Sequence, residues 1–88
     1  MIRINNDYVI LGDSKDYTLA LDLHREDKNN QPIYKSLGYY GTVQTALNGL
    51  YKHLTKKAVA EKIMSLQEAA KEFERIEEDL KQYYKRFA

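Results

Sequence analysis

The side chains of this sequence best suited to proton transfer are those of two histidines. His24 follows Asp22 by two residues in a segment that alternates apolar and polar residues, so both side chains are expected on the same side of a strand. A carboxylate in that position can orient an imidazole that acts as a general base. No candidate nucleophile or glycine-rich oxyanion turn lies nearby in the sequence, so we interpret the pair as part of a solvated sheet face. His53 is expected to be exposed near a helix end.

Metal and cofactor binding are not expected. The sequence has no Cys, which excludes disulfides and thiolate ligands, and neither a His-x3-His pair nor the spacing of an EF-hand loop occurs. The run from Gly38 to Thr42 has the outline of a phosphate cradle, but it lacks the lysine of a nucleotide-binding loop. We interpret it as a strand-to-helix turn that uses glycine for tight backbone angles. The sequence therefore predicts no metal, no cofactor and no enzymatic activity.

Eight tyrosines in a chain without tryptophan are the feature most suited to binding. Tyrosine combines a broad apolar ring with a polar tip and few rotatable bonds, which suits recognition surfaces and equally the half-buried positions of a small sheet. Lysines of the central segment suit phosphates, an acidic partner or simply a solvated helix face. We predict a partner-binding surface made of Tyr34, Tyr39, Tyr40, Lys52, Lys56 and Lys57.

Length and composition are typical of one small globular domain. The chain has 88 residues, of which 43% are hydrophobic and 31% charged. There is no run of about 18 apolar residues, so no membrane partner is expected. The N-terminal residues lack the apolar run of a signal peptide, which predicts a cytoplasmic location. The net charge is +1 and only residues 42–63 are basic, so direct nucleic-acid binding is the secondary hypothesis.

Residues 1–41 have the pattern of an antiparallel meander of three or four strands. The clearest strand lies at 17–24, where Tyr17 and three leucines alternate with polar residues, and Ala20 falls among the polar positions. Turn residues follow Ile4 and Leu11, and a polar loop at 27–32 precedes a strand over 33–40. Regular alternation in that strand places Ile33, Leu37 and Tyr39 on one face and Tyr34 and Tyr40 on the other.

At Thr42 the apolar period changes from two to 3.6, which indicates a helix. Thr42 is a suitable N-cap, and the sequence predicts a helix over 42–54. Residues 55–64 either extend this helix or form a separate turn. The apolar stripe of the helix is Val43, Ala46, Leu47, Leu50 and Leu54.

The last helix is predicted to begin after Ser65, because Ser65 and Glu68 have the spacing of a capping box. Its apolar positions recur at alternating spacings of three and four, as in a heptad seam. Such a seam either packs within the chain or pairs with the seam of a second copy. The seam consists of Leu66, Ala69, Phe73, Ile76, Leu80, Tyr83 and Phe87.

These patterns together predict an α+β fold. We expect a single domain over residues 1–88, in which residues 1–41 form the antiparallel sheet and residues 42–88 form two helices, the last one long.

The run Gly38 to Val43, together with the N-terminal Ile4-Asn5-Asn6-Asp7-Tyr8 and the Ser65 to Glu68 helix start, resembles small proteins encoded by tailed phages and prophages. The resemblance covers nearly the whole chain. It implies a short sheet that ends in a Gly-Tyr-Tyr turn and leads into two helices, and no catalytic residues come with it.

The resemblance also implies a function. Small phage proteins of this kind tend to act by binding, so the expectation is a non-enzymatic inhibitor of a host protein or ribonucleoprotein complex, such as a CRISPR effector or another defence nuclease. The location would then be the cytoplasm of the bacterial host. The alternative is a small dimeric DNA-binding accessory protein that presents its lysines to phosphates.

Overall fold

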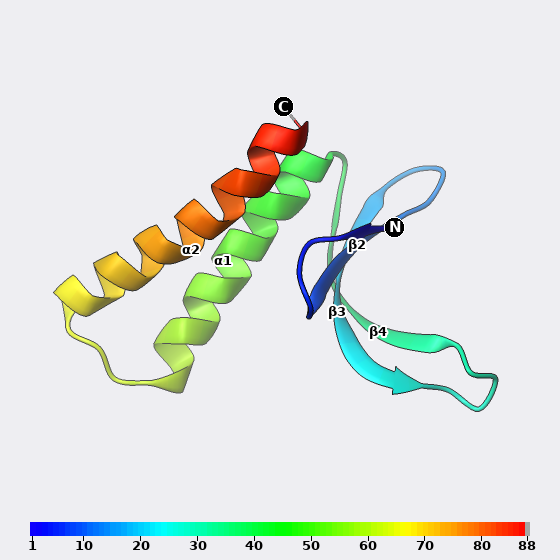
Figure 1. Ribbon diagram of the computed structural model, residues 1–88, viewed down its shortest axis with the longest axis horizontal. Coiled ribbons are helices and arrows are strands. Elements are labelled where there is room, and N and C mark those ends of the chain that lie inside the picture. Colours follow the sequence, from blue (N-terminus) through cyan, green and yellow to red (C-terminus); the bar gives the residue numbers. More distant parts are fainter. Residues whose placement is uncertain (88) are drawn as a thin grey trace. The chain divides into compact units, whose positions relative to one another are not determined.

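The computed structural model describes residues 1–87, and the side chains of residues 1–82. Four strands precede two helices: β1 (Ile2–Arg3), β2 (Tyr8–Gly12), β3 (Tyr17–Glu26), β4 (Pro32–Tyr40), α1 (Val43–Glu61) and α2 (Leu66–Phe87). The strands form one antiparallel sheet in the order β1-β2-β3-β4, as Figure 1 shows. The predicted α+β meander followed by two helices is confirmed. The chain forms two compact units, residues 1–46 and 47–88, so the division falls inside α1.

Each turn of the meander begins with an Asn or Asp side chain that accepts two backbone N–H groups. Asn5 Oδ1 accepts from Asp7 and Tyr8, both at 2.9 Å. The carboxylates of the other two turns do the same: Asp13 Oδ1 accepts from residues 15 and 16, and Asp27 Oδ1 accepts from residues 29 and 31. These short side chains satisfy N–H groups that the ladders leave unpaired, so they fix where each strand ends.

The pairing of β3 with β4 contains two irregularities. Leu19 pairs with Gly38 but Ala20 pairs with Ser36, so Leu37 is an extra residue in β4. Further along, residues 23–25 of β3 lie between two paired positions where β4 has only residue 33. The first is a β-bulge of one extra residue, so it reverses the alternation of side chains along β4. The second inserts two extra residues into β3, an even number, so it does not.

Both faces of the sheet contain buried residues at the centre. Ile10 and Leu19 are paired across β2 and β3 and are 1% exposed each. Val9 and Ala20 are paired on the other face and are completely buried. Ala20 lies on the same side of β3 as Thr18 and Asp22, as the alternation predicts, but it is completely buried because its larger neighbours shield a small side chain at the middle of the sheet.

The helix α1 begins as predicted and ends later. Thr42 Oγ1 accepts the Thr45 N–H at 3.1 Å, and Thr45 Oγ1 accepts the Thr42 N–H at 3.2 Å, so the two threonines form a reciprocal cap. The helix then continues to Glu61, because residues 55–61 contain alanines and lysines, which favour helix, and no Gly or Pro to stop it. The buried part of its stripe is Ala46, Leu47 and Leu50.

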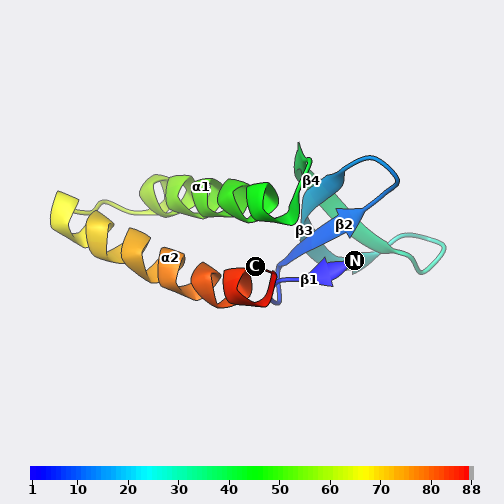
Figure 2. The ribbon, with the colours of Figure 1, turned by 90° about the horizontal axis from the view of Figure 1, so that it is seen from above.

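Residues 47–87 form a helical hairpin, in which α2 runs back alongside α1 in the opposite direction (Figures 1 and 2). Ser65 caps α2, since its Oγ accepts the Glu68 N–H at 3.1 Å. The reciprocal bond from the Ser65 N–H to the Glu68 carboxylate is not formed between these two described residues. Ile76 and Leu80 are buried, with 6% and 3% of their surfaces exposed.

The burial of Leu50 gives a prediction for stability. Replacing Leu50 by Ala should lower the free energy of unfolding by about 2 to 5 kcal/mol, because it removes buried apolar contacts and leaves a cavity. Lys52→Ala, an exposed position on the same helix, should stay within about 0.5 kcal/mol. Urea unfolding followed by circular dichroism measures both. Equal losses in the two variants would show that Leu50 is not a core residue.

Candidate binding surface

The bulge at Leu37 decides which tyrosines of β4 share a face. Directly paired residues of adjacent strands point to the same side of a sheet. Thr18 pairs with Tyr39 and Asp22 pairs with Tyr34, and residues 18 and 22 lie on one face of β3. Tyr34 and Tyr39 therefore share a face.

Tyr40 lies on the opposite face. It pairs with Tyr17, which belongs to the same side of β3 as Leu19. The prediction that Tyr34 and Tyr40 lie together, opposite Tyr39, is wrong, because it assumed regular alternation through the extra residue of β4. We call the side with Tyr34 and Tyr39 the tyrosine face; its polar and aromatic members are Arg3, Thr18, Asp22, Tyr34, Ser36 and Tyr39.

The two tyrosines of this face differ in exposure. Tyr39 is 70% exposed, which is unusual for a large aromatic side chain in a sheet. Tyr34 is half-buried, and its hydroxyl donates to Met1 Sδ at 3.5 Å. Met1 is itself 71% exposed, so the face offers two ring surfaces and a thioether to a partner.

Tyr40 is half-buried because its ring lies over Gly38. A Cβ added to Gly38 would lie 2.9 Å from the Tyr40 hydroxyl oxygen and 3.0 Å from the nearest ring carbon. Glycine at position 38 thus makes room for the ring. This contact assigns Tyr40 to sheet packing, whereas the sequence placed it on the binding surface.

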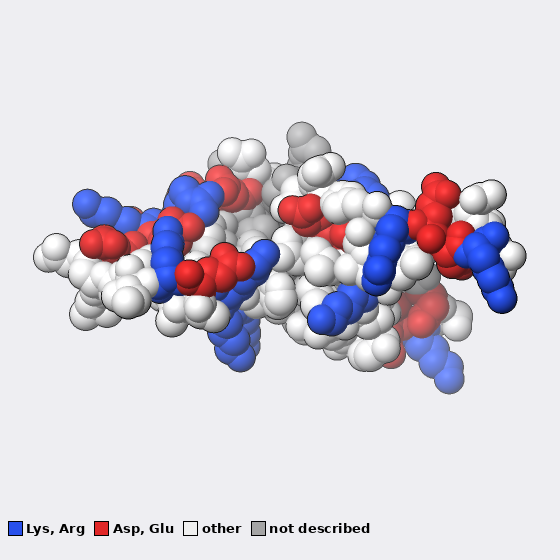
Figure 3. Space-filling model, turned by 90° about the horizontal axis from the view of Figure 1, so that it is seen from below, with Lys and Arg blue, Asp and Glu red and all other residues white. Residues whose placement is uncertain are grey.

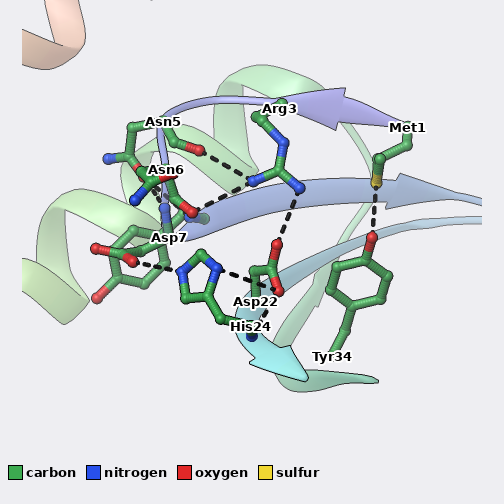
Figure 4. Close-up of polar contacts among 9 residues, drawn as sticks. Met1, Arg3, Asn5, Asn6, Asp7, Asp22, His24 and Tyr34 are labelled. Carbon is green, nitrogen blue, oxygen red and sulfur yellow. Dashed lines mark hydrogen bonds and ion pairs between the residues drawn. The ribbon is translucent and has the colours of Figure 1, made fainter. Parts of the chain in front are cut away.

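A network of polar groups surrounds the edge of the tyrosine face (Figure 4). Arg3 Nη2 donates to Asp22 Oδ2 at 2.9 Å, and Arg3 Nη1 donates to the carbonyl oxygens of Asn5 and Asn6 at 3.4 and 3.3 Å. The guanidinium of β1 therefore joins the first turn of the sheet to β3. The Asp22 side chain is only 13% exposed, which makes it the most shielded carboxylate of this network.

His24 occupies the irregular part of β3 and has a left-handed backbone, with a φ of 56°. The Asp22 Oδ1 atom accepts the His24 N–H at 2.8 Å, which stabilises this otherwise unfavourable conformation. The imidazole Nε2 lies 2.9 Å from Asp7 Oδ1, while Nδ1 lies 3.9 Å from Asp22 Oδ1, beyond hydrogen-bond distance. Asp22 thus orients the backbone of residue 24 more directly than it orients the ring.

The hydrogen bonds to Asp22 lower the pKa of its carboxyl below the ordinary value of 3.8. The His24 backbone N–H makes the largest contribution, followed by the hydrogen bond from Arg3. The pKa of Asp13 is lowered in the same way, by the N–H groups of residues 16 and 15. Both carboxylates are therefore held in the ionised form that the turns require.

The lysines predicted for the binding surface all lie on α1 and are exposed: Lys52, Lys56 and Lys57. Lys57 Nζ is 3.9 Å from Glu61 Oε1, one turn further along the helix. Figure 3 shows acidic and basic side chains intermixed on the face that it displays. Lys52, Lys56 and Lys57 belong to the unit that begins at residue 47, whereas the tyrosine face belongs to the sheet of residues 1–46, so each is treated as a candidate surface by itself.

The seam predicted for the last helix is covered along only part of its length. Ile76 and Leu80 are buried, Ala69 and Phe73 are half-buried, and Leu66 is 88% exposed. The predicted positions Tyr83 and Phe87 lie outside the part of the chain whose side chains are described.

Within residues 1–87, His, Asp and Glu side chains do not gather in groups of three or more that could hold a metal ion. No helix in the same part of the chain is long and apolar enough to span a membrane.

Comparison with protein-family models found no match, and searches of curated proteins and of solved structures found no significant similarity.

The sequence reasoning missed Arg3, Asp7 and Met1, which contact Asp22, His24 and Tyr34 across the sheet. The position of Arg3 could have been predicted from the sequence. It lies between Ile2 and Ile4 in a short edge strand, so its side chain points to the face opposite those two apolar residues. Its partner could not be read from spacing, because 19 positions separate Arg3 from Asp22.

The lowered pKa of Asp22 gives a prediction for the pH dependence of stability. Because the folded-state pKa lies below the unfolded value, the ionised carboxylate contributes stability above about pH 4, and this contribution is lost as the pH falls through the folded-state pKa. Asp22→Asn should therefore lower the melting temperature at pH 7 and flatten its decline between pH 5 and pH 2, as measured by thermal unfolding.

Glu26→Gln is the control for this experiment, since it removes an exposed carboxylate of β3. It should leave the melting temperature at pH 7 almost unchanged. If Asp22→Asn and Glu26→Gln gave the same profile as the wild type, the Arg3–Asp22 network would have no role in stability.

Proposed function

We propose that this protein acts by binding a macromolecular partner through the tyrosine face of its sheet. The observation that carries the proposal is the 70% exposure of Tyr39 on the same face as Tyr34. Exposed tyrosines with fixed backbones are typical of interaction hot spots, because a rigid ring brings a large apolar area at a small cost in entropy.

The polar surroundings of these rings also suit a binding surface. The Arg3–Asp22 pair lies on the same face, and Thr18 and Ser36 provide hydroxyl groups between the charged pair and Tyr39. This arrangement resembles a protein interface. The aromatic rings can be buried by a partner, while the ion pair and the hydroxyl groups form a polar rim around them. Such a patch favours a protein partner.

Binding agrees better than catalysis with the arrangement of the two titratable groups that the sequence singled out. His24 and Asp22 are engaged in hydrogen bonds that hold an irregular strand, and the His24 Nε2 is directed at Asp7. A general base needs a ring nitrogen that faces a substrate. We therefore assign both residues to the support of the tyrosine face.

The class of partner rests on the resemblance to small phage proteins. On that ground we propose a host protein or ribonucleoprotein complex in the bacterial cytoplasm, such as a CRISPR effector or another defence nuclease, which the protein would inhibit by occupying its surface. Affinity capture of the tagged protein from a nuclease-treated bacterial lysate, followed by mass spectrometry, should recover one stoichiometric host complex. Recovery of no specific protein would contradict the proposal.

Substitution of Tyr39 tests the surface itself. Tyr39→Ala should weaken binding to the captured complex by about 30-fold or more, the loss typical of a tyrosine hot spot worth 2 kcal/mol. Tyr40→Phe is the matched control, because it retains the ring over Gly38 on the opposite face and should leave affinity unchanged. Titration calorimetry with purified complex distinguishes the two variants, and an unchanged affinity of Tyr39→Ala would exclude this face.

A second candidate function is DNA binding through α1, and the exposed lysines at positions 52, 56 and 57 favour it. If three of these contacts neutralise phosphates, affinity for duplex DNA should fall roughly 40-fold between 50 and 200 mM salt. Fluorescence anisotropy with labelled DNA measures this dependence. A flat salt response, or retention of the captured partner after nuclease treatment, would eliminate this candidate.

A further inference from the structure

Three large apolar side chains are exposed where the two helices of the hairpin are connected. Ile63 is 101% exposed, Leu66 is 88% exposed and Val59 is 55% exposed. They lie within eight consecutive residues, whereas the other exposed large apolar side chains of the described chain, Met1 and Tyr39, belong to the sheet. We call Val59, Ile63 and Leu66 the hairpin tip. Apolar side chains clustered in this way on a surface are typical of an interaction site.

The tip continues an apolar stripe that is already partly covered. Along α2 the stripe passes from Leu66 through Phe73, which is half-buried, to Ile76 and Leu80, which are buried. The heptad spacing of this seam is the pattern by which helices pair. Among its described side chains, Ile76 and Leu80 are buried and Leu66 is exposed, so the end at Leu66 is open to a second helical surface.

The charges of the two helices are opposite near the tip. Residues 47–62 contain four lysines and one glutamate, a net charge of +3. Residues 66–80 contain six acidic and two basic side chains, a net charge of −4, and three further basic residues bring the whole of α2 to −1. An anionic partner at the tip would therefore be attracted to α1 and repelled by the first four turns of α2. A second copy of the same hairpin is complementary in charge to both helices at once, if each α1 lies beside the α2 of the other copy.

Each helix has an exposed row of residues that begins with an alanine near the tip and continues with charged residues, lysines on α1 and glutamates on α2. On α1, Lys52, Lys56 and Ala60 recur at four-residue spacing and are exposed. The equivalent exposed row on α2, counted outward from the tip, begins with Ala70 and continues with Glu74 and Glu78. In an antiparallel pairing with the tips aligned, Ala60 would lie opposite Ala70, Lys56 opposite Glu74 and Lys52 opposite Glu78. Rows at this spacing are the ridges along which helices pack.

We propose that the hairpin tip is a self-association site, at which two copies pair side by side with their tips aligned and each α1 row lies against the α2 row of the other copy. The contact is isologous, so each complementary pair of rows occurs twice. Val59, Ile63 and Leu66 of both copies would form its apolar centre, and the lysine and glutamate rows would fix its register.

Sedimentation velocity over a concentration series of the whole protein tests this proposal. The wild type should shift from monomer toward dimer as concentration rises, and Ile63→Lys should raise the dissociation constant at least tenfold. Ile63 is fully exposed and lies between the helices, so this substitution should leave circular dichroism and melting temperature unchanged. Tyr39→Ser is the matched control, since it removes an equally large exposed apolar side chain from the sheet and should leave dimerisation unchanged.

Charge reversal tests the register. The variants Lys52→Glu/Lys56→Glu and Glu74→Lys/Glu78→Lys should each dimerise more weakly than the wild type when alone, and an equimolar mixture should form a heterodimer. A wild type that remains monomeric up to millimolar concentration would overturn the proposal. So would equal effects of Ile63→Lys and Tyr39→Ser, or a mixture that associates no better than its components.

Discussion

One extra residue in β4 determines how this protein presents its aromatic side chains. Up to Leu19 and Gly38 the β3–β4 ladder is regular, and from Ala20 and Ser36 it is regular again, but Leu37 has no partner of its own. The insertion reverses the alternation of the strand. Tyr39 consequently joins Tyr34 on one face, and Tyr40 falls on the other, where its ring covers Gly38. A side chain at position 38 would collide with that ring, so the glycine and the bulge act together.

The irregular sheet is held in place by short polar side chains. Asn5, Asp13 and Asp27 each accept two backbone N–H groups at the start of a turn, and Asp22 accepts the N–H of the left-handed His24. Asp22 also receives the Arg3 guanidinium, which ties the edge strand to the middle of the sheet. The same hydrogen bonds lower the pKa of the Asp13 and Asp22 carboxyl groups, because they stabilise the ionised form. At the turns and at His24, these contacts satisfy backbone N–H groups that the ladders leave unpaired.

The elements of the fold were predictable because their signals are local and repeated. The alternation at 17–24, the Thr42 cap and the Ser65 cap each act within a few residues, and all three were located correctly. The bulges were not predictable, because an extra residue leaves no mark in the alternation of Ile33, Tyr34, Leu37, Tyr39 and Tyr40; it is decided by pairing with β3. For the same reason the predicted grouping of Tyr34 with Tyr40, opposite Tyr39, was wrong.

Cross-strand nuclear Overhauser effects measure the pairing of Thr18 with Tyr39 and of Ala20 with Ser36, on which the arrangement of the tyrosines depends. We expect backbone contacts within both pairs and between Asp22 and Tyr34, with no cross-strand partner for Leu37. A regular ladder would instead give contacts between Ala20 and Leu37 and between Asp22 and Lys35. That result would place Tyr34 on the face of Tyr40 and would contradict the assignment of the tyrosine face.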